Sequence, residues 1–115
     1  MHVIEAKLDT PMEYIFNLNI MSDAELVGNL TVYKHPQDSK GGQVHIEIVP
    51  KWRCRWLSRT LRNDIMSKVK ANAKKHNLSI LYSTALTAVS PRLLIFAGFL
   101  EYYKRQPKTY YYLMI

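Results

Sequence analysis

The stretch VHIEIVPKWRCRWLSRTLRNDIMSKVKANA, residues 44–73, decides the fold because the spacing of its apolar residues changes within it. Val44, Ile46 and Ile48 alternate with polar residues, which is typical of a strand with one buried face. From residue 57 onward the spacing becomes four, which predicts an amphipathic helix of about five turns. The apolar positions of this helix are Leu57, Leu61, Ile65, Val69 and Ala73. The chain therefore passes from a strand directly into a helix.

Upstream of this stretch, alternating apolar residues predict three more strands, over residues 2–8, 14–20 and 26–33. Residues 10–13, Thr-Pro-Met-Glu, also fit a capping box with Pro at the first helical position. The alternation that follows is rich in strand formers, so we predict a strand there. A turn at residues 21–24 makes an antiparallel hairpin. The residues expected on one face of its second strand are Leu26, Gly28, Leu30 and Val32.

Downstream of the helix, Asn77 is a stop signal, and residues 78–84 form an apolar run that predicts a buried strand. Ser90 and Pro91 then open a shorter helix that ends at Gly98. Two closing strands are expected over residues 100–104 and 109–115, around the turn Gln106-Pro107-Lys108. The predicted order is ββββαβαββ, which makes residues 1–115 a single α+β domain.

Composition limits the class of protein. The chain has 115 residues, of which 48% are hydrophobic, with only 4 Gly and 5 Pro, so we exclude a disordered tail, a collagen and a multidomain enzyme. The single Cys54 cannot form an intramolecular disulfide, and no apolar run approaches the roughly 18 residues that span a bilayer. The four histidines have no metal-ligand spacing, so we predict no metal site. A reduced, cytoplasmic protein is expected.

The net charge of +7 is concentrated in one segment. Residues 51–76 carry nine basic side chains against Asp64 alone. Such a basic face could contact phosphate groups of a cofactor or of nucleic acid, but solvation or protein contact also explains it. The tyrosines near the end of the chain leave a similar choice between stacking on bases and packing across the sheet.

The element order resembles the GNAT acyltransferase superfamily, and three local stretches strengthen the resemblance over about residues 13–115. Residues 49–58, Val-Pro-Lys-Trp-Arg-Cys-Arg-Trp-Leu-Ser, look like that superfamily's coenzyme A loop, V-x-P-x-x-R-G-x-G-x-G/A. Gly98-Phe99 matches its G-F after the short helix, and the closing pair of strands is rich in aromatic residues. The resemblance implies a mixed sheet of about seven strands and two main helices.

The same resemblance implies a degenerate cofactor loop. In the superfamily, backbone N–H groups at the helix start face the pyrophosphate, and glycines allow its close approach. Arg53 and Ser58 match the motif, whereas Cys54 and Trp56 replace the two glycines. The cofactor would be acetyl-CoA, bound weakly or not at all. The residues carried over as cofactor-binding are Val49, Arg53, Cys54, Arg55, Trp56, Leu57 and Ser58.

The catalytic positions are only partly matched. A general base often comes from the strand before the loop, where Glu47 and His45 share one face. Many members have a Tyr that protonates the leaving thiolate four residues before the Gly of G-F, and here that position is Leu94. The Asn of the superfamily near the helix start aligns with Thr87. Cys54 could be a nucleophile, although no positioned His is evident nearby, and an unreactive thiol is the simpler interpretation.

The N-terminal region is short for this superfamily, which usually places one or two helices between its first strands. Residues 9–13 leave no room for them, so we expect these helices to be shortened or absent. The apolar side chains Ile4, Leu8, Tyr14, Phe16 and Leu18 would then lack an intramolecular cover. Uncovered apolar area usually marks a partner surface, which predicts a protein partner or a homo-oligomer through the N-terminal strands.

A looser resemblance links the chain to GNAT-like internal virion proteins of short-tailed phages. It rests on Trp-Arg in the loop, the basic helix that follows, and the run from Arg92 to Gly98 leading into aromatic strands. Three functions remain open from the sequence. The first is a GNAT-fold protein with a degenerate acyl-CoA site that acts through binding, as a virion-associated or host-interaction component. The second is an acetyl-CoA-dependent N-acetyltransferase, and the third is a non-specific nucleic-acid-binding module that uses the basic helix.

Overall fold

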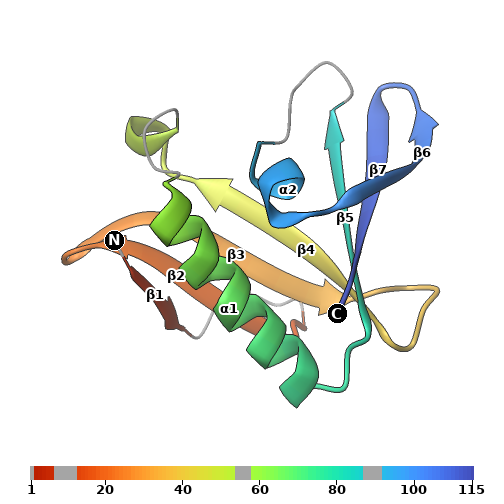
Figure 1. The fold of residues 1–115 in the computed structure, drawn as a ribbon, viewed down its shortest axis with the longest axis horizontal. Coiled ribbons are helices and arrows are strands. Elements are labelled where there is room, and N and C mark those ends of the chain that lie inside the picture. Colours follow the sequence, from red (N-terminus) through yellow and green to blue (C-terminus); the bar gives the residue numbers. More distant parts are fainter. Residues whose placement is uncertain (1, 7–12, 54–57, 87–91) are drawn as a thin grey trace.

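The computed structural model describes residues 2–6, 13–53, 58–86 and 92–115 and shows seven strands and two α-helices in this part of the chain (Figure 1). The order confirms the predicted ββββαβαββ. The elements are β1 (His2–Glu5), β2 (Phe16–Ser22), β3 (Glu25–Lys34), β4 (Gly41–Ile48), α1 (Arg59–Lys75), β5 (Ile80–Leu86), α2 (Arg92–Ala97), β6 (Leu100–Arg105) and β7 (Lys108–Met114).

One mixed sheet joins all seven strands in the order β1-β2-β3-β4-β5-β7-β6. Every neighbouring pair is antiparallel except β4 and β5, which are parallel. A parallel pair needs a crossover, and α1 supplies it. The chain is therefore the α+β fold with a mixed sheet that the resemblance implied.

The two ends of helix α1 are each fixed by a capping hydrogen bond. The Ser58 side chain caps its start, since its Oγ accepts the backbone N–H of Leu61 at 3.1 Å. At its end, Asn77 adopts a positive φ of 60°. The N–H of Leu78 then reaches back to the Ala73 carbonyl at 2.8 Å, a Schellman closure. Asn77 therefore ends the helix, as the sequence predicted, and β5 starts two residues later than the sequence indicated.

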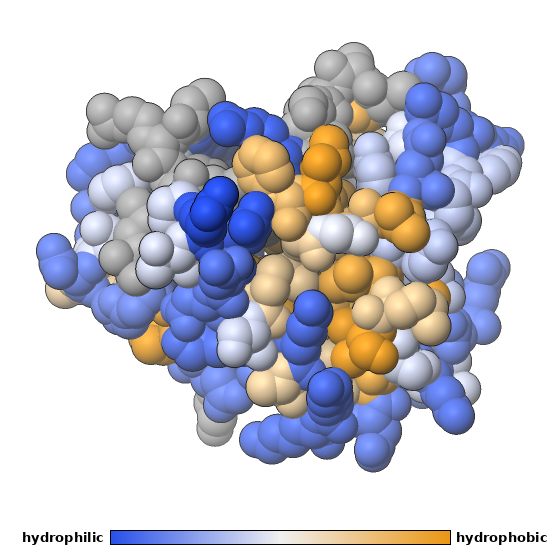
Figure 2. Space-filling model, viewed as in Figure 1, coloured by the Kyte–Doolittle hydropathy of each residue, from blue (hydrophilic) through white to orange (hydrophobic). Residues whose placement is uncertain are grey.

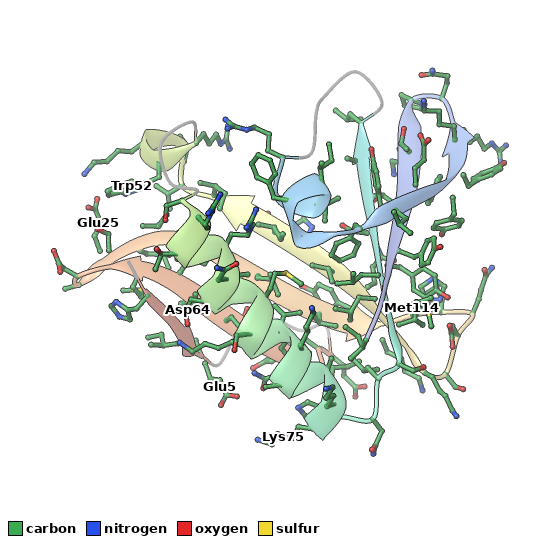
Figure 3. The ribbon with its side chains drawn as sticks, viewed as in Figure 1. Glu5, Glu25, Trp52, Asp64, Lys75 and Met114 are labelled. Atoms are coloured by element: carbon green, nitrogen blue, oxygen red, sulfur yellow. The ribbon has the colours of Figure 1, made fainter. Side chains whose placement is uncertain are left out.

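The apolar stripe of α1 covers one face of the sheet (Figure 1). Its buried residues are Leu61, Ile65, Val69, Asn72 and Ala73. They face the inward side chains of β2, β3 and β4, among them Leu18, Ile20 and Val32, none of which is exposed. The helix also holds the first strand, because Asp64 accepts the Val3 backbone N–H at 3.1 Å (Figure 3).

The expectation that β2 exposes apolar side chains is wrong for Phe16 and Leu18, which are 5% and 0% exposed. The reason is that α1 lies across β2 as well as β4, and the Phe16 ring stacks on His76 at its end, with ring centres 5.9 Å apart. Tyr14 is half-buried, Ile4 is 44% exposed, and Leu8 lies outside the described residues. The described residues between β1 and β2 contain no helix.

A bulge in β3 changes one predicted face. The register moves from Ile20 opposite Gly28 to Met21 opposite Leu26, so Val27 is the extra residue. Val27 is fully buried, whereas Leu26 is 43% exposed. Gly28, Leu30 and Val32 stay on the buried face as predicted, but Leu26 was wrongly placed there.

Replacing Ile65 by Ala tests the packing of α1. Ile65 is fully buried, so we expect a loss of about 2–5 kcal/mol in the free energy of unfolding. Ile95→Ala removes the same atoms from a side chain that is 53% exposed and should change stability by less than about 0.5 kcal/mol. Urea unfolding followed by circular dichroism measures both, and equal losses would show that α1 does not pack as described.

Candidate functional site

The two parallel strands part from each other soon after they meet. Gly41, Gly42 and Gln43 of β4 pair with Ile80, Leu81 and Tyr82 of β5, and no further β4–β5 backbone pairing is seen in the described part of these strands. One side-chain hydrogen bond still links the two strands beyond this point, from Ser83 Oγ of β5 to the Val44 carbonyl of β4 at 3.2 Å. Towards their carboxyl ends the strands diverge (Figure 1). Ligand sites of α/β sheets lie at such carboxyl ends.

The closed end of this gap is held by Tyr82. Its hydroxyl donates to Asp38 Oδ2 at 2.7 Å, and the His35 ring packs on its ring with centres 4.2 Å apart. The hydrogen bond from Tyr82 lowers the pKa of Asp38, and the same bond raises the pKa of Tyr82. Gly41 permits this approach, because a Cβ there would lie 2.7 Å from Tyr82 Cε2.

On the helix side, the site is a small apolar cavity of about 10 Å³, room for about one water molecule. It lies between β4 and the two helices. Figure 2 shows apolar side chains gathered in the middle of this face, with hydrophilic residues around them. The cavity is lined by Leu30, Val44, Ile46, Ile65, Met66, Val69, Leu94, Ala97 and Phe99.

On the opposite side of β4, the structure brings the two predicted catalytic residues together. His45 Nε2 and Glu47 Oε1 lie 3.1 Å apart, and both side chains are exposed. They stand on the part of β4 that does not pair with β5, and their register partners on β3 are Thr31 and Asn29. Those neighbours belong to a polar row, in which Thr31 Oγ1 lies 2.8 Å from both Asn17 Oδ1 and Asn29 Oδ1 and can donate its single proton to either of them. An acidic and a basic group thus face solvent beside the gap.

The loop after β4 is described as far as Arg53. The Val49 N–H bonds the Val27 carbonyl at 2.8 Å, and Pro50–Trp52 form a 3-10 turn. The Arg53 Nε donates to the Ile48 carbonyl at 3.3 Å, which holds this side chain against β4. Of the other predicted cofactor-binding residues, Ser58 caps α1. Cys54, Arg55, Trp56 and Leu57 lie outside the described residues.

Trp52 packs against the core. Lys51 lies over its ring at 5.6 Å and also reaches Glu25 Oε1 at 2.7 Å. The hydrogen bond from Lys51 lowers the pKa of Glu25. Figure 3 shows Glu25 and Trp52 beside each other at this end of the sheet.

Sequence reasoning missed a cationic rim on the helix side. Two guanidinium groups, those of Arg62 and Arg92, each lie 5.8 Å from the centre of the exposed Phe96 ring on α2. Arg92 and Phe96 are four residues apart on one helix, a spacing that signals a contact. The partner from α1 could be found only from the tertiary structure.

No three His, Cys, Asp or Glu side chains group as a possible metal site within the described ranges. Nor does any helix in the part of the chain that the structure describes have the length and apolar character to cross a membrane.

The fold is that of GNAT acetyltransferases. The GNAT domain of S. lividans PAT superimposes with a TM-score of 0.70 at 9% identity, over 87% of this chain and 60% of that one. The Campylobacter jejuni N-acetyltransferase PseH, in complex with acetyl coenzyme A, superimposes with a TM-score of 0.63 at 13% identity, over 86% of this chain and 67% of that one. Ribosomal-protein-alanine N-acetyltransferase from Brucella melitensis superimposes with a TM-score of 0.66 at 14% identity, over 87% of this chain and 68% of that one.

Likeness at these identities establishes the fold alone. No protein-family model matches the sequence, and no curated protein matches it either. The chain spans only 60% of the length of the S. lividans domain.

The hydrogen bond from Tyr82 to Asp38, together with the His35 ring on Tyr82, forms a clamp at the closed end of the gap. Its contribution to the free energy of unfolding should depend on pH, and Tyr82→Phe removes the hydrogen bond. The lowered pKa of Asp38 means that its contribution is present above the ordinary Asp range near pH 4 and is lost as pH falls. The raised pKa of Tyr82 means that its contribution is lost as pH rises beyond about 10.

The stability difference between the wild type and Tyr82→Phe should therefore be largest between about pH 5 and 9 and shrink on both sides. Urea midpoints across pH 3–11 measure it. Tyr103→Phe is the matched control, because that side chain is 52% exposed, and its difference should stay flat. A flat profile for both variants would contradict the clamp.

Proposed function

We propose that this protein has the GNAT fold with a degenerate acyl-CoA site, and that it acts by binding, as a virion-associated or host-interaction component of a phage. The observation that carries this proposal is the cavity of about 10 Å³ between β4 and the helices. Apolar side chains of the protein itself, such as Met66 and Leu94, line this small space. A cofactor arm would have to displace these packed side chains, which costs free energy.

The loop residues support the same conclusion. The start of α1 offers backbone N–H groups and the positive end of the helix dipole, and its first turn holds no acidic residue. In the family motif, glycines let the pyrophosphate approach such groups, whereas this chain has Cys54 and Trp56 at those positions. The electrostatic attraction of the site is retained, but the residue types that permit close approach are not.

The phage context rests on the sequence resemblance to internal virion proteins, and two properties of the chain agree with it. The described connection between β1 and β2 has no helix to form an acceptor wall. Exposed apolar side chains on α2 and β6, such as Phe96 and Leu100, offer area for macromolecular contacts.

The alternative function is an acetyl-CoA-dependent N-acetyltransferase, and the paired His45 and Glu47 favour it. In that reaction Glu47 would accept the proton of the attacking amine, and the amine nitrogen would take the acetyl group from sulfur. The departing thiolate needs a proton. Leu94 stands where many family members have the Tyr donor, and its buried side chain has no proton to give. A candidate base is therefore present while the proton donor is missing, and this favours the degenerate site.

Acetyl-CoA binding separates these two functions. We expect a dissociation constant weaker than about 1 mM, which corresponds to less than roughly 4 kcal/mol of binding free energy. Isothermal titration calorimetry of the full chain measures it. The double variant Cys54→Gly with Trp56→Gly restores the motif glycines and should bind at least about tenfold more tightly, with Cys54→Ala as the matched control that leaves Trp56 in place.

Micromolar affinity in the wild type would overturn the degenerate site. The enzyme would then be tested by acetyl transfer to a panel of primary amines, where Glu47→Gln should reduce turnover by about 100-fold or more if Glu47 is the base.

Contact of the basic helix with nucleic acid should be weak and independent of sequence. The basic side chains of α1 would meet phosphates only, so binding should fall steeply between 50 and 200 mM salt. Fluorescence anisotropy with two unrelated duplexes measures this, and Lys70→Glu should weaken both equally. Tight binding to one sequence at 200 mM salt would instead support a nucleic-acid-binding module.

A further inference from the structure

The exposed apolar side chains of the described chain gather near its C-terminal strands. Ile4 and Leu26 lie elsewhere, but the other large exposed apolar residues belong to β5, α2, β6 and β7. They are Leu86, Ile95, Phe96, Leu100, Tyr102, Tyr103 and Met114. The densest group lies on β6, where all six residues are exposed. This strand is also the outer edge of the sheet, next to β7 (Figure 1).

A bulge places two neighbouring tyrosines of β6 on one face. The register moves from Glu101 opposite Tyr111 to Tyr103 opposite Tyr110, so Tyr102 is the extra residue. The Tyr102 ring lies 5.8–6.3 Å from the rings of Tyr82, Tyr110 and Tyr112, and the Tyr103 ring lies 5.5 Å from that of Tyr110. Both therefore lie on the face away from the helices.

The charged residues of β6 lie on the other face. Glu101 and Lys104 have Tyr111 and Thr109 as register partners, which point towards the helices and the core. Their side chains pair with each other, Nζ to Oε1, at 3.3 Å. Leu100 and Arg105 pair with Tyr112 and Lys108 and so share the face of the two tyrosines.

These faces make the strand complementary to itself. A two-fold axis between Tyr102 and Tyr103 would bring a second β6 alongside in antiparallel direction. Glu101 would then lie opposite Lys104 of the second copy, Tyr102 opposite Tyr103, and Leu100 opposite Arg105. Each opposed pair shares a face only because of the bulge, since a regular strand would set an odd-numbered residue on the face opposite an even-numbered one.

We propose that a second copy of this chain pairs with β6 in this register and continues the sheet across the two molecules. The pairing would satisfy the outer backbone groups of the edge strand and place two Glu101–Lys104 ion pairs across the seam. Four tyrosines would meet at its centre, and the Arg105 stem would cover Leu100. The inference does not depend on whether the cleft binds acyl-CoA, because β6 lies at the sheet edge, two strands beyond β5.

The seam is short, so the dimer should be weak. Six residues a side bury less than the roughly 1,600 Å² of a standard interface, and a dissociation constant on the order of tens of micromolar is expected. Sedimentation velocity of the full chain from 5 to 500 µM should show a monomer–dimer equilibrium.

Charge reversal tests the register. Glu101→Lys sets lysines against lysines across the seam, and Lys104→Glu sets glutamates against glutamates, so each single variant should dimerise at least about tenfold more weakly. An equimolar mixture of the two should recover the wild-type affinity as a heterodimer. In that heterodimer the introduced lysine of one copy meets the introduced glutamate of the other, and the unchanged Lys104 of the first copy meets the unchanged Glu101 of the second. A purely intramolecular Glu101–Lys104 pair could not produce this recovery.

Glu5→Lys and Lys70→Glu are the matched controls, since they reverse the same charges on β1 and α1 and should leave the affinity unchanged. Circular dichroism confirms that every variant folds. A wild-type monomer at 500 µM would overturn the proposal. A dimer that both single variants leave intact, or that the mixture does not restore, would overturn the β6 register.

Discussion

Three residue pairs join β4 to β5, and the rest of the structure depends on where they stop. They are possible because the first two residues of β4 are glycines in a crowded place. A Cβ on Gly42 would lie 2.6 Å from Val32 Cγ1 and 3.1 Å from Leu81 Cδ2. Because backbone pairing between the two strands is confined to this end, their carboxyl ends are free to diverge, and α1 connects them along the chain.

The divergence gives β4 two different sides. Towards the helices, its residues line an apolar cavity of about 10 Å³. Away from them, His45 and Glu47 form an exposed pair beside a polar row on β2 and β3. The helix side of β4 is apolar, whereas the other side carries two ionisable groups.

The two edges of the sheet are protected to different degrees. β1 has four residues, and Asp64 of α1 holds one of its backbone N–H groups. β6 has six exposed residues, and its bulge brings apolar and charged groups into a self-complementary order. Short or covered edges resist pairing, and long apolar ones invite it. Of the N-terminal side chains that the sequence marked as an interface, Phe16 and Leu18 are covered by α1, and most of the exposed large apolar side chains of the described residues lie towards the opposite edge.

The sequence by itself determined the elements and their order, because local periodicity is enough for that. Alternation in β4 and four-residue spacing in α1 indicate which faces are buried, and the shared parity of His45 and Glu47 puts them on one face. Contacts between distant segments were decided only in the tertiary structure. Asp38 meets Tyr82 across 44 positions, Arg62 meets Phe96 between two helices, and α1 covers Phe16. The bulges at Val27 and Tyr102 also arise only when strands pair, because an extra residue exists only relative to a partner strand.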